Sequence, residues 1–152
     1  MVLNFLRESE SVDPASLGVI GYCMGGAVAY LAAAFHCDVR AAAVLYGPDL
    51  VSPTISLGTP MSPLELADRI TCPMLWLSAS GDVLVPPSEV EAIAARMAEA
   101  GADFECHVYE DDDVGHAFFD EDVPRFYNAA AAAWGWPLQM DFLRRHLRTG
   151  RS

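Results

Sequence analysis

A cysteine set among small residues is the feature of this sequence that most directly suggests chemistry. Cys23 stands in the run Gly-Tyr-Cys-Met-Gly-Gly (residues 21–26), with an apolar segment before it and an alanine-rich segment after it. This layout is typical of a nucleophile elbow, in which a strand passes through a tight, strained turn directly into a helix. The residues two before and two after the nucleophile must then be small, and Gly21 and Gly25 occupy both positions. The pattern predicts that Cys23 is a reactive nucleophile.

The predicted elbow would also support the reaction of this thiol. A cysteine at the beginning of a helix is favoured as a thiolate, because the helix dipole and the free N–H groups there stabilise negative charge. The backbone N–H of Met24 would point into the same pocket and form one half of an oxyanion hole. Gly26 would let the helix approach the sheet closely. The alternative is a packed thiol at an ordinary tight turn.

A nucleophile of this kind needs a base within hydrogen-bond reach, and the base needs an acid that orients it. Asp82 follows a predicted strand at 74–78, and His116 follows another at 104–109. Parallel strands deliver their carboxyl ends to one edge of a sheet, so Cys23, Asp82 and His116 should meet there. Taken alone, Asp82 could simply cap a turn. The order nucleophile, acid, histidine favours a catalytic triad, because it is the order of α/β hydrolases.

The elements that would position these residues alternate between strand and helix. Apolar runs predict strands at 17–22, 39–46, 74–78 and 104–109. Helices are predicted at 24–35, from a capping box at 62–65, from a second capping box at 88–91, and from Pro124 onward, with a kink or break at 135–137. This alternation predicts an α/β fold with a parallel sheet covered on both faces, in the order of the second half of an α/β-hydrolase sheet.

Composition restricts the function classes further. The chain has 152 residues, which we interpret as a single domain over 1–152, and a formal net charge of −12, which argues against binding to nucleic acid. No apolar run approaches a membrane span, and residues 1–11 lack the apolar segment of a signal peptide, so we expect a cytoplasmic protein without a membrane partner. The four cysteines show no paired spacing, and Asp111–Asp113 reads as a solvated loop. We therefore predict neither a metal nor a cofactor.

Aromatic residues near the ends of the predicted strands are candidates for a substrate pocket. Tyr46 ends the second strand, and Phe118 and Phe119 follow His116 closely. These three side chains would line a pocket beside Cys23, with plain core packing as the alternative.

Several blocks of the sequence together resemble the dienelactone hydrolase family. They are Gly-Tyr-Cys-Met-Gly-Gly at 21–26, the strand that ends at Asp82 before Val-Pro, and Gly-His-Ala-Phe-Phe at 115–119 ahead of a helix ending in Ala-Ala-Trp. The resemblance implies a hydrolase of the carboxymethylenebutenolidase type, which opens an enol lactone or cleaves a related small ester. It implies a covalent intermediate on Cys23, with His116 as the base and Asp82 as the acid that holds its tautomer.

The resemblance covers only the C-terminal part of such a domain. A complete α/β-hydrolase domain has further strands before the nucleophile strand, and they supply the second oxyanion donor. We therefore expect a truncated domain of about four strands, whose nucleophile strand forms an open sheet edge. That edge predicts self-association, or association with the missing N-terminal half. The alternative to an enzyme is a catalytically silent remnant that serves as an association module.

Overall fold

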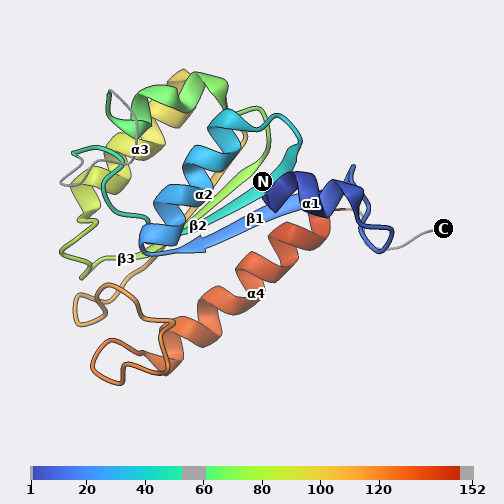
Figure 1. Cartoon of the computed structure of the whole chain (residues 1–152). Coiled ribbons are helices and arrows are strands. Elements are labelled where there is room, and N and C mark those ends of the chain that lie inside the picture. Colours follow the sequence, from blue (N-terminus) through green and yellow to red (C-terminus); the bar gives the residue numbers. More distant parts are fainter. Residues whose placement is uncertain (1, 53–60, 148–152) are drawn as a thin grey trace.

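Four parallel strands form the sheet in this computed structural model, which describes residues 2–52 and 61–147 (Figure 1). The strands are β1 (Leu17–Tyr22), β2 (Val39–Leu45), β3 (Met74–Ala79) and β4 (Phe104–Tyr109). They lie in the order β1-β2-β3-β4, and each neighbouring pair is parallel. The predicted α/β class is confirmed, and all four strands lie where the apolar runs placed them.

Helices cover both faces of this sheet, as Figure 1 shows. The helical segments are α1 (Val2–Glu8), α2 (Met24–Phe35), the 3₁₀ segment η1 (Pro63–Arg69), α3 (Pro87–Glu99) and α4 (Ala129–His146). One core lies between the sheet and α2, η1 and α3, and a second core lies between the sheet and α4. No helix in the described ranges combines the length and apolar content that a membrane span needs.

The two outer strands differ from the two inner ones in burial. β3 is buried at every position and β2 at all but one, whereas β4 is half-buried throughout. β1 forms the other edge of the described sheet, where Ile20 is 41% exposed and Tyr22 is 37% exposed. The nucleophile strand is therefore an edge strand in this structure, as expected.

The predicted helix start after Ser62 is confirmed, because η1 begins at Pro63, but the capping hydrogen bonds predicted at Ser62 and Ser88 are wrong. The Ser62 side chain caps no N–H group of η1, because its hydroxyl donates instead to the carbonyls of Leu50 and Val51. α3 begins two residues earlier than its box implied, at Pro87 rather than Glu89, so that Ser88 lies inside the helix. Proline fixes φ near the helical value and needs no hydrogen-bond partner for its nitrogen, so it begins a helix without a side-chain cap.

The prediction for the last helix is wrong about where the helix begins, and of the kink or break predicted at 135–137 the break does not occur. α4 begins at Ala129 rather than near Pro124, and the Asn128 side chain caps it by accepting a hydrogen bond from the Ala131 N–H at 2.9 Å. The helix then continues through Pro137 without a break. Pro137 lies on its exposed side, while Gly135 lies so close to the Phe119 ring that an added Cβ would approach it to 2.8 Å. Packing on the sheet outweighs the local preference of proline.

Candidate active site

Cys23 lies in the sharp turn between β1 and α2. Its backbone has φ 52° and ψ −127°, a left-handed φ that a residue with a side chain adopts only under constraint. Its N–H donates to the Leu45 carbonyl at 3.0 Å, and its carbonyl accepts from the Gly26 N–H at 2.7 Å. These two bonds tie the turn to β2 on one side and to the start of α2 on the other.

The glycines around the turn do not contribute equally. A Cβ on Gly21 would lie 1.8 Å from the Gly25 carbonyl oxygen, so no larger residue fits without moving the backbone. A Cβ on Gly26 would lie 2.9 Å from the Gly47 Cα, which confirms the predicted close approach of α2 to the sheet. Around Gly25 itself, nothing would lie within 4 Å of an added Cβ. The expectation that both flanking positions must be small is correct for Gly21 and wrong for Gly25.

The three predicted triad residues form one hydrogen-bonded chain. His116 Nε2 lies 2.9 Å from Cys23 Sγ, and His116 Nδ1 lies 2.9 Å from Asp82 Oδ2. The Asp82 side chain is 1% exposed and that of His116 is 12% exposed, so water competes little for these contacts. A thiol, an imidazole and a carboxylate joined in this order have the geometry that a catalytic triad requires.

Asp82 also caps a turn, which was the alternative role that its sequence context suggested. Its Oδ1 accepts hydrogen bonds from the N–H groups of Leu84 at 2.9 Å and Val85 at 3.1 Å. Because Oδ1 binds the turn and Oδ2 binds His116, the two roles use different oxygens. The turn therefore fixes the carboxylate in the orientation that the imidazole needs.

The loops that carry Asp82 and His116 are in direct contact. A Cβ on Gly81 would approach the Asp112 carbonyl oxygen to 2.2 Å, and the Ser80 hydroxyl accepts from the Asp111 N–H at 2.9 Å. These loops follow β3 and β4, which are neighbours in the sheet. The parallel sheet thus brings the loops together, and their close contact sets the distance between acid and base.

The environment of His116 favours its protonated form. Burial lowers the pKa of His116, but hydrogen bonds and charge interactions with Asp82 and Cys23 outweigh it and leave the pKa raised above 6.5. A base must be neutral to accept a proton, so an imidazole with a raised pKa loses activity as the pH falls through that higher value.

This shift predicts the pH dependence of the rate. We expect the acidic limb of kcat/KM for a small activated ester to have its midpoint above pH 6.5. Asp82→Asn removes the carboxylate that favours the imidazolium, so the midpoint should move to lower pH while the maximal rate falls. Rate profiles of the wild-type chain and of Asp82→Asn between about pH 5 and pH 9 measure both effects. An Asp82→Asn profile with an unchanged midpoint would contradict the assignment.

Met24 lies where the predicted oxyanion donor was expected. It is the first residue of α2, and the first N–H groups of a helix have no acceptor within the helix.

Within the described residues, no group of three or more His, Cys, Asp or Glu side chains has the arrangement of a metal site.

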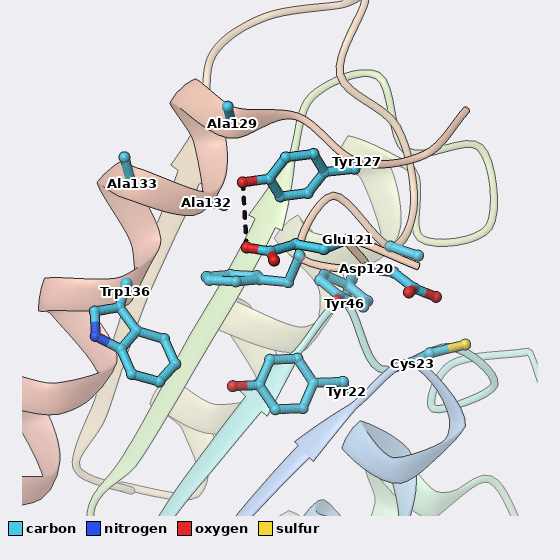
Figure 2. A pocket seen from close by; sticks show the side chains of 12 residues that line it. Tyr22, Cys23, Tyr46, Asp120, Glu121, Tyr127, Ala129, Ala132, Ala133 and Trp136 are labelled. Atoms are coloured by element: carbon cyan, nitrogen blue, oxygen red, sulfur yellow. Dashed lines mark hydrogen bonds between the residues drawn. The ribbon is translucent and has the colours of Figure 1, made fainter. Parts of the chain in front are cut away.

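A cavity of about 660 Å³ opens beside Cys23, between the strand ends and the beginning of α4 (Figure 2). Of the three predicted lining residues, Tyr46 and Phe119 line it. The prediction for Phe118 is wrong, because its side chain is fully buried in the core and packs against the Tyr46 ring at 5.2 Å. Neighbouring residues of a loop point in different directions, which the sequence does not reveal.

Sequence reasoning missed most of the lining. The other described residues around the cavity are Tyr22, Cys23, Ala117, Asp120, Glu121, Tyr127, Ala129, Ala132, Ala133 and Trp136. Tyr22 could have been found, since it directly precedes the nucleophile at the strand end. The residues from 117 to 136 follow the path of an irregular loop into α4, for which the sequence carried no signal.

A parallel sheet in which one strand turns sharply into a helix at a Cys or Ser, with an Asp and then a His after later strands, is the arrangement of the α/β-hydrolase class. The chain belongs to the dienelactone hydrolase family, whose sequence model matches residues 1–147. It is 32% identical over 134 residues to a Yersinia pestis protein provisionally named a carboxymethylenebutenolidase, and 30% identical over 142 residues to one of that name from Methylorubrum extorquens. These matches include 88% and 93% of this chain but 48% and 47% of the relatives, so the chain spans about half their length.

Solved structures agree with this assignment. A crystal structure from Klebsiella pneumoniae, provisionally described as a dienelactone hydrolase, superposes with a TM-score of 0.80 at 28% identity, covering 93% of this chain and 57% of that one. An acylaminoacyl peptidase superposes with a TM-score of 0.77 at 17% identity, covering 99% of this chain and 27% of the peptidase, and shows the shared fold alone.

Proposed function

We propose that this chain carries the catalytic centre of a hydrolase that cleaves a small ester or lactone through a Cys23-His116-Asp82 triad. The observation that carries this proposal is the pair of 2.9 Å contacts that join Cys23 Sγ to His116 and His116 to Asp82. Membership of the dienelactone hydrolase family, and relatives named as carboxymethylenebutenolidases, support a lactone or related ester as the substrate.

The first half of the proposed reaction transfers the acyl group to sulfur. Cys23 Sγ attacks the carbonyl carbon while His116 Nε2 takes the thiol proton, and the carbonyl oxygen becomes an oxyanion that the Met24 N–H stabilises. When the carbon–oxygen bond breaks, His116 returns the proton to the departing oxygen and a thioester remains on Cys23. In a lactone this oxygen stays attached to the acyl group.

The second half releases the acid. A water molecule attacks the thioester carbonyl while His116 takes its proton, and the carbon–sulfur bond then breaks. The thiolate recovers the proton from His116, and the product leaves as a carboxylic acid. Asp82 holds Nδ1 of the imidazole throughout, so that Nε2 faces the sulfur.

The thioester is the species that a direct experiment should detect. We expect that acid-quenching the chain during turnover of para-nitrophenyl acetate leaves one acetyl group on the peptide that contains Cys23, observed by mass spectrometry. His116→Ala should form far less of it, because the proton has no acceptor. Cys37 is exposed and serves as an internal control for random acetylation. Equal labelling of Cys23 and Cys37 would contradict the proposal.

A second function, association through the sheet edge, is favoured by the exposed apolar side chains along β1 and α2. Ile20, Tyr22, Met24, Val28 and Phe35 are all exposed there. Burial of exposed apolar side chains and pairing of an open strand edge both drive association, so we propose that the chain self-associates at micromolar concentration.

Light scattering after size-exclusion chromatography tests this association. Ile20→Lys should shift the chain to monomer, because it places a charge on the exposed edge strand β1. Val83→Lys, in an exposed loop after β3, should leave the assembly unchanged. A monomeric wild-type chain would contradict this second function without affecting the first.

A further inference from the structure

Three aromatic rings stand side by side in the cavity next to the nucleophile. The centroid of the Tyr22 ring lies 5.7 Å from that of Phe119, in edge-on geometry, and 6.3 Å from that of Tyr46, in tilted geometry. The Tyr22 hydroxyl donates to Gln139 Oε1 at 2.9 Å, which fixes the direction of that ring. A cation within about 6 Å of such ring faces is attracted by their π electrons.

Two carboxylates line the same cavity. Asp120 and Glu121 are exposed and line the cavity. Glu121 accepts a hydrogen bond from the Tyr127 hydroxyl at 3.4 Å, and Figure 2 shows its carboxylate among the aromatic side chains. In the same view, the Asp120 carboxylate lies on the side of the cavity nearer Cys23.

Within residues 2–52 and 61–147, these carboxylates have no positively charged partner in a salt bridge. The salt bridges among the described residues use other acids, and neither Asp120 nor Glu121 takes part in one. None of the described lining residues is Lys, Arg or His. The cavity therefore presents uncompensated negative charge beside aromatic surface, on a chain whose formal net charge is −12.

We propose that this pocket selects esters whose non-reacting end carries an ammonium group, over uncharged esters of the same shape and over esters that bear a carboxylate. The inference rests on the proposed function, because the same cavity opens to Cys23. The rings supply the contact surface for the methyl or methylene groups around the nitrogen. Asp120 and Glu121 supply the charge, and their effect should weaken as salt is added.

Three para-nitrophenyl esters test the selectivity. Their acyl groups are γ-trimethylammonium butyrate, its uncharged tert-butyl isostere and glutarate, and each rate is divided by the rate of spontaneous hydrolysis. For the wild-type chain at low salt we expect kcat/KM for the cationic ester to exceed that for the isostere by about tenfold, with the glutarate ester the slowest. The double variant Asp120→Asn with Glu121→Gln should bring the cationic-to-neutral ratio close to one.

A matched control separates local from overall charge. Glu91→Gln with Glu99→Gln removes the same charge from exposed positions on α3, and it should retain the tenfold preference. An equal loss of preference in this control would overturn the assignment to the pocket. A wild-type ratio near one, or a ratio that the Asp120 and Glu121 variant does not lower, would overturn the inference itself.

Binding to an inactive chain distinguishes failure of the inference from failure of the proposed function. Calorimetric titration of Cys23→Ala with phenyltrimethylammonium should show binding that weakens about tenfold when Asp120 and Glu121 are also neutralised. Absence of this binding overturns the inference even if all three esters are hydrolysed. Cation binding without Cys23-dependent hydrolysis would overturn the proposed function and leave the charge assignment of the pocket intact.

Discussion

Cys23→Ala is expected to lower kcat/KM for para-nitrophenyl acetate by about a thousandfold or more. The variant retains the fold of the elbow but has no atom that can form the thioester, and water must then attack the ester directly. His116→Ala should lose a similar factor, because the thiol is left without the base that lies 2.9 Å from it. The double variant should lose little more, since residues that act as one unit are not additive.

Cys37→Ala is the matched control for this experiment. Cys37 is exposed and lies between the end of α2 and the beginning of β2. It is therefore at the amino ends of the parallel strands, whereas the triad residues lie beyond their carboxyl ends. The same chemical change at that position should leave the rate at the wild-type value. Should Cys23→Ala retain more than about half of the wild-type rate, the proposed catalytic role of the thiol is wrong.

Gly21→Ala is expected to lower the free energy of unfolding by about 3 kcal/mol. The added methyl group would lie 1.8 Å from the Gly25 carbonyl oxygen and 2.7 Å from the Gly26 nitrogen, and both are backbone atoms that cannot rotate away. For a chain of this size the loss corresponds to a fall in Tm of roughly 10 °C. Because relief of the clash must move the turn that carries Cys23, hydrolysis should fall as well.

The same substitution at Gly25 provides the comparison. A Cβ there meets nothing within 4 Å, and Gly25 lies in the first turn of α2. Alanine in a helix is favoured over glycine by up to about 1 kcal/mol, so Gly25→Ala should keep or slightly raise Tm. Thermal melts followed by circular dichroism measure both variants. Equal Tm values for the two would mean that the approach of Gly21 to the elbow is not a constraint on the fold.

The sheet and the meeting of Cys23, Asp82 and His116 could be predicted because each depends on a pattern that survives in one sequence. Buried parallel strands are continuous apolar runs, and parallel strands bring their carboxyl ends to one edge. Helix caps were predicted less well. η1 begins at Pro63 as predicted, but the Ser62 hydroxyl donates to carbonyls of a preceding segment, and no local sequence pattern indicates that contact.

The substrate cavity could not be predicted for a related physical reason. The residues between His116 and Asn128 contain turns rather than a repeating structure, so no periodicity indicates which side chains face inward. Phe118 and Phe119 are adjacent and equally apolar, yet the first is in the core and the second lines the cavity. Asp120 and Glu121 are exposed, as their charge predicts, but the sequence does not indicate that the loop places them at the cavity.

The order of the strands also affects how the site would be assembled as the chain is synthesised. Each strand pairs with the one made just before it, so the sheet can grow in the order in which its strands leave the ribosome. Cys23 follows the first of these strands and His116 the last. Cys23 and His116 can therefore meet only after β4 has been synthesised, and we expect any reactivity that depends on the pair to arise late in folding.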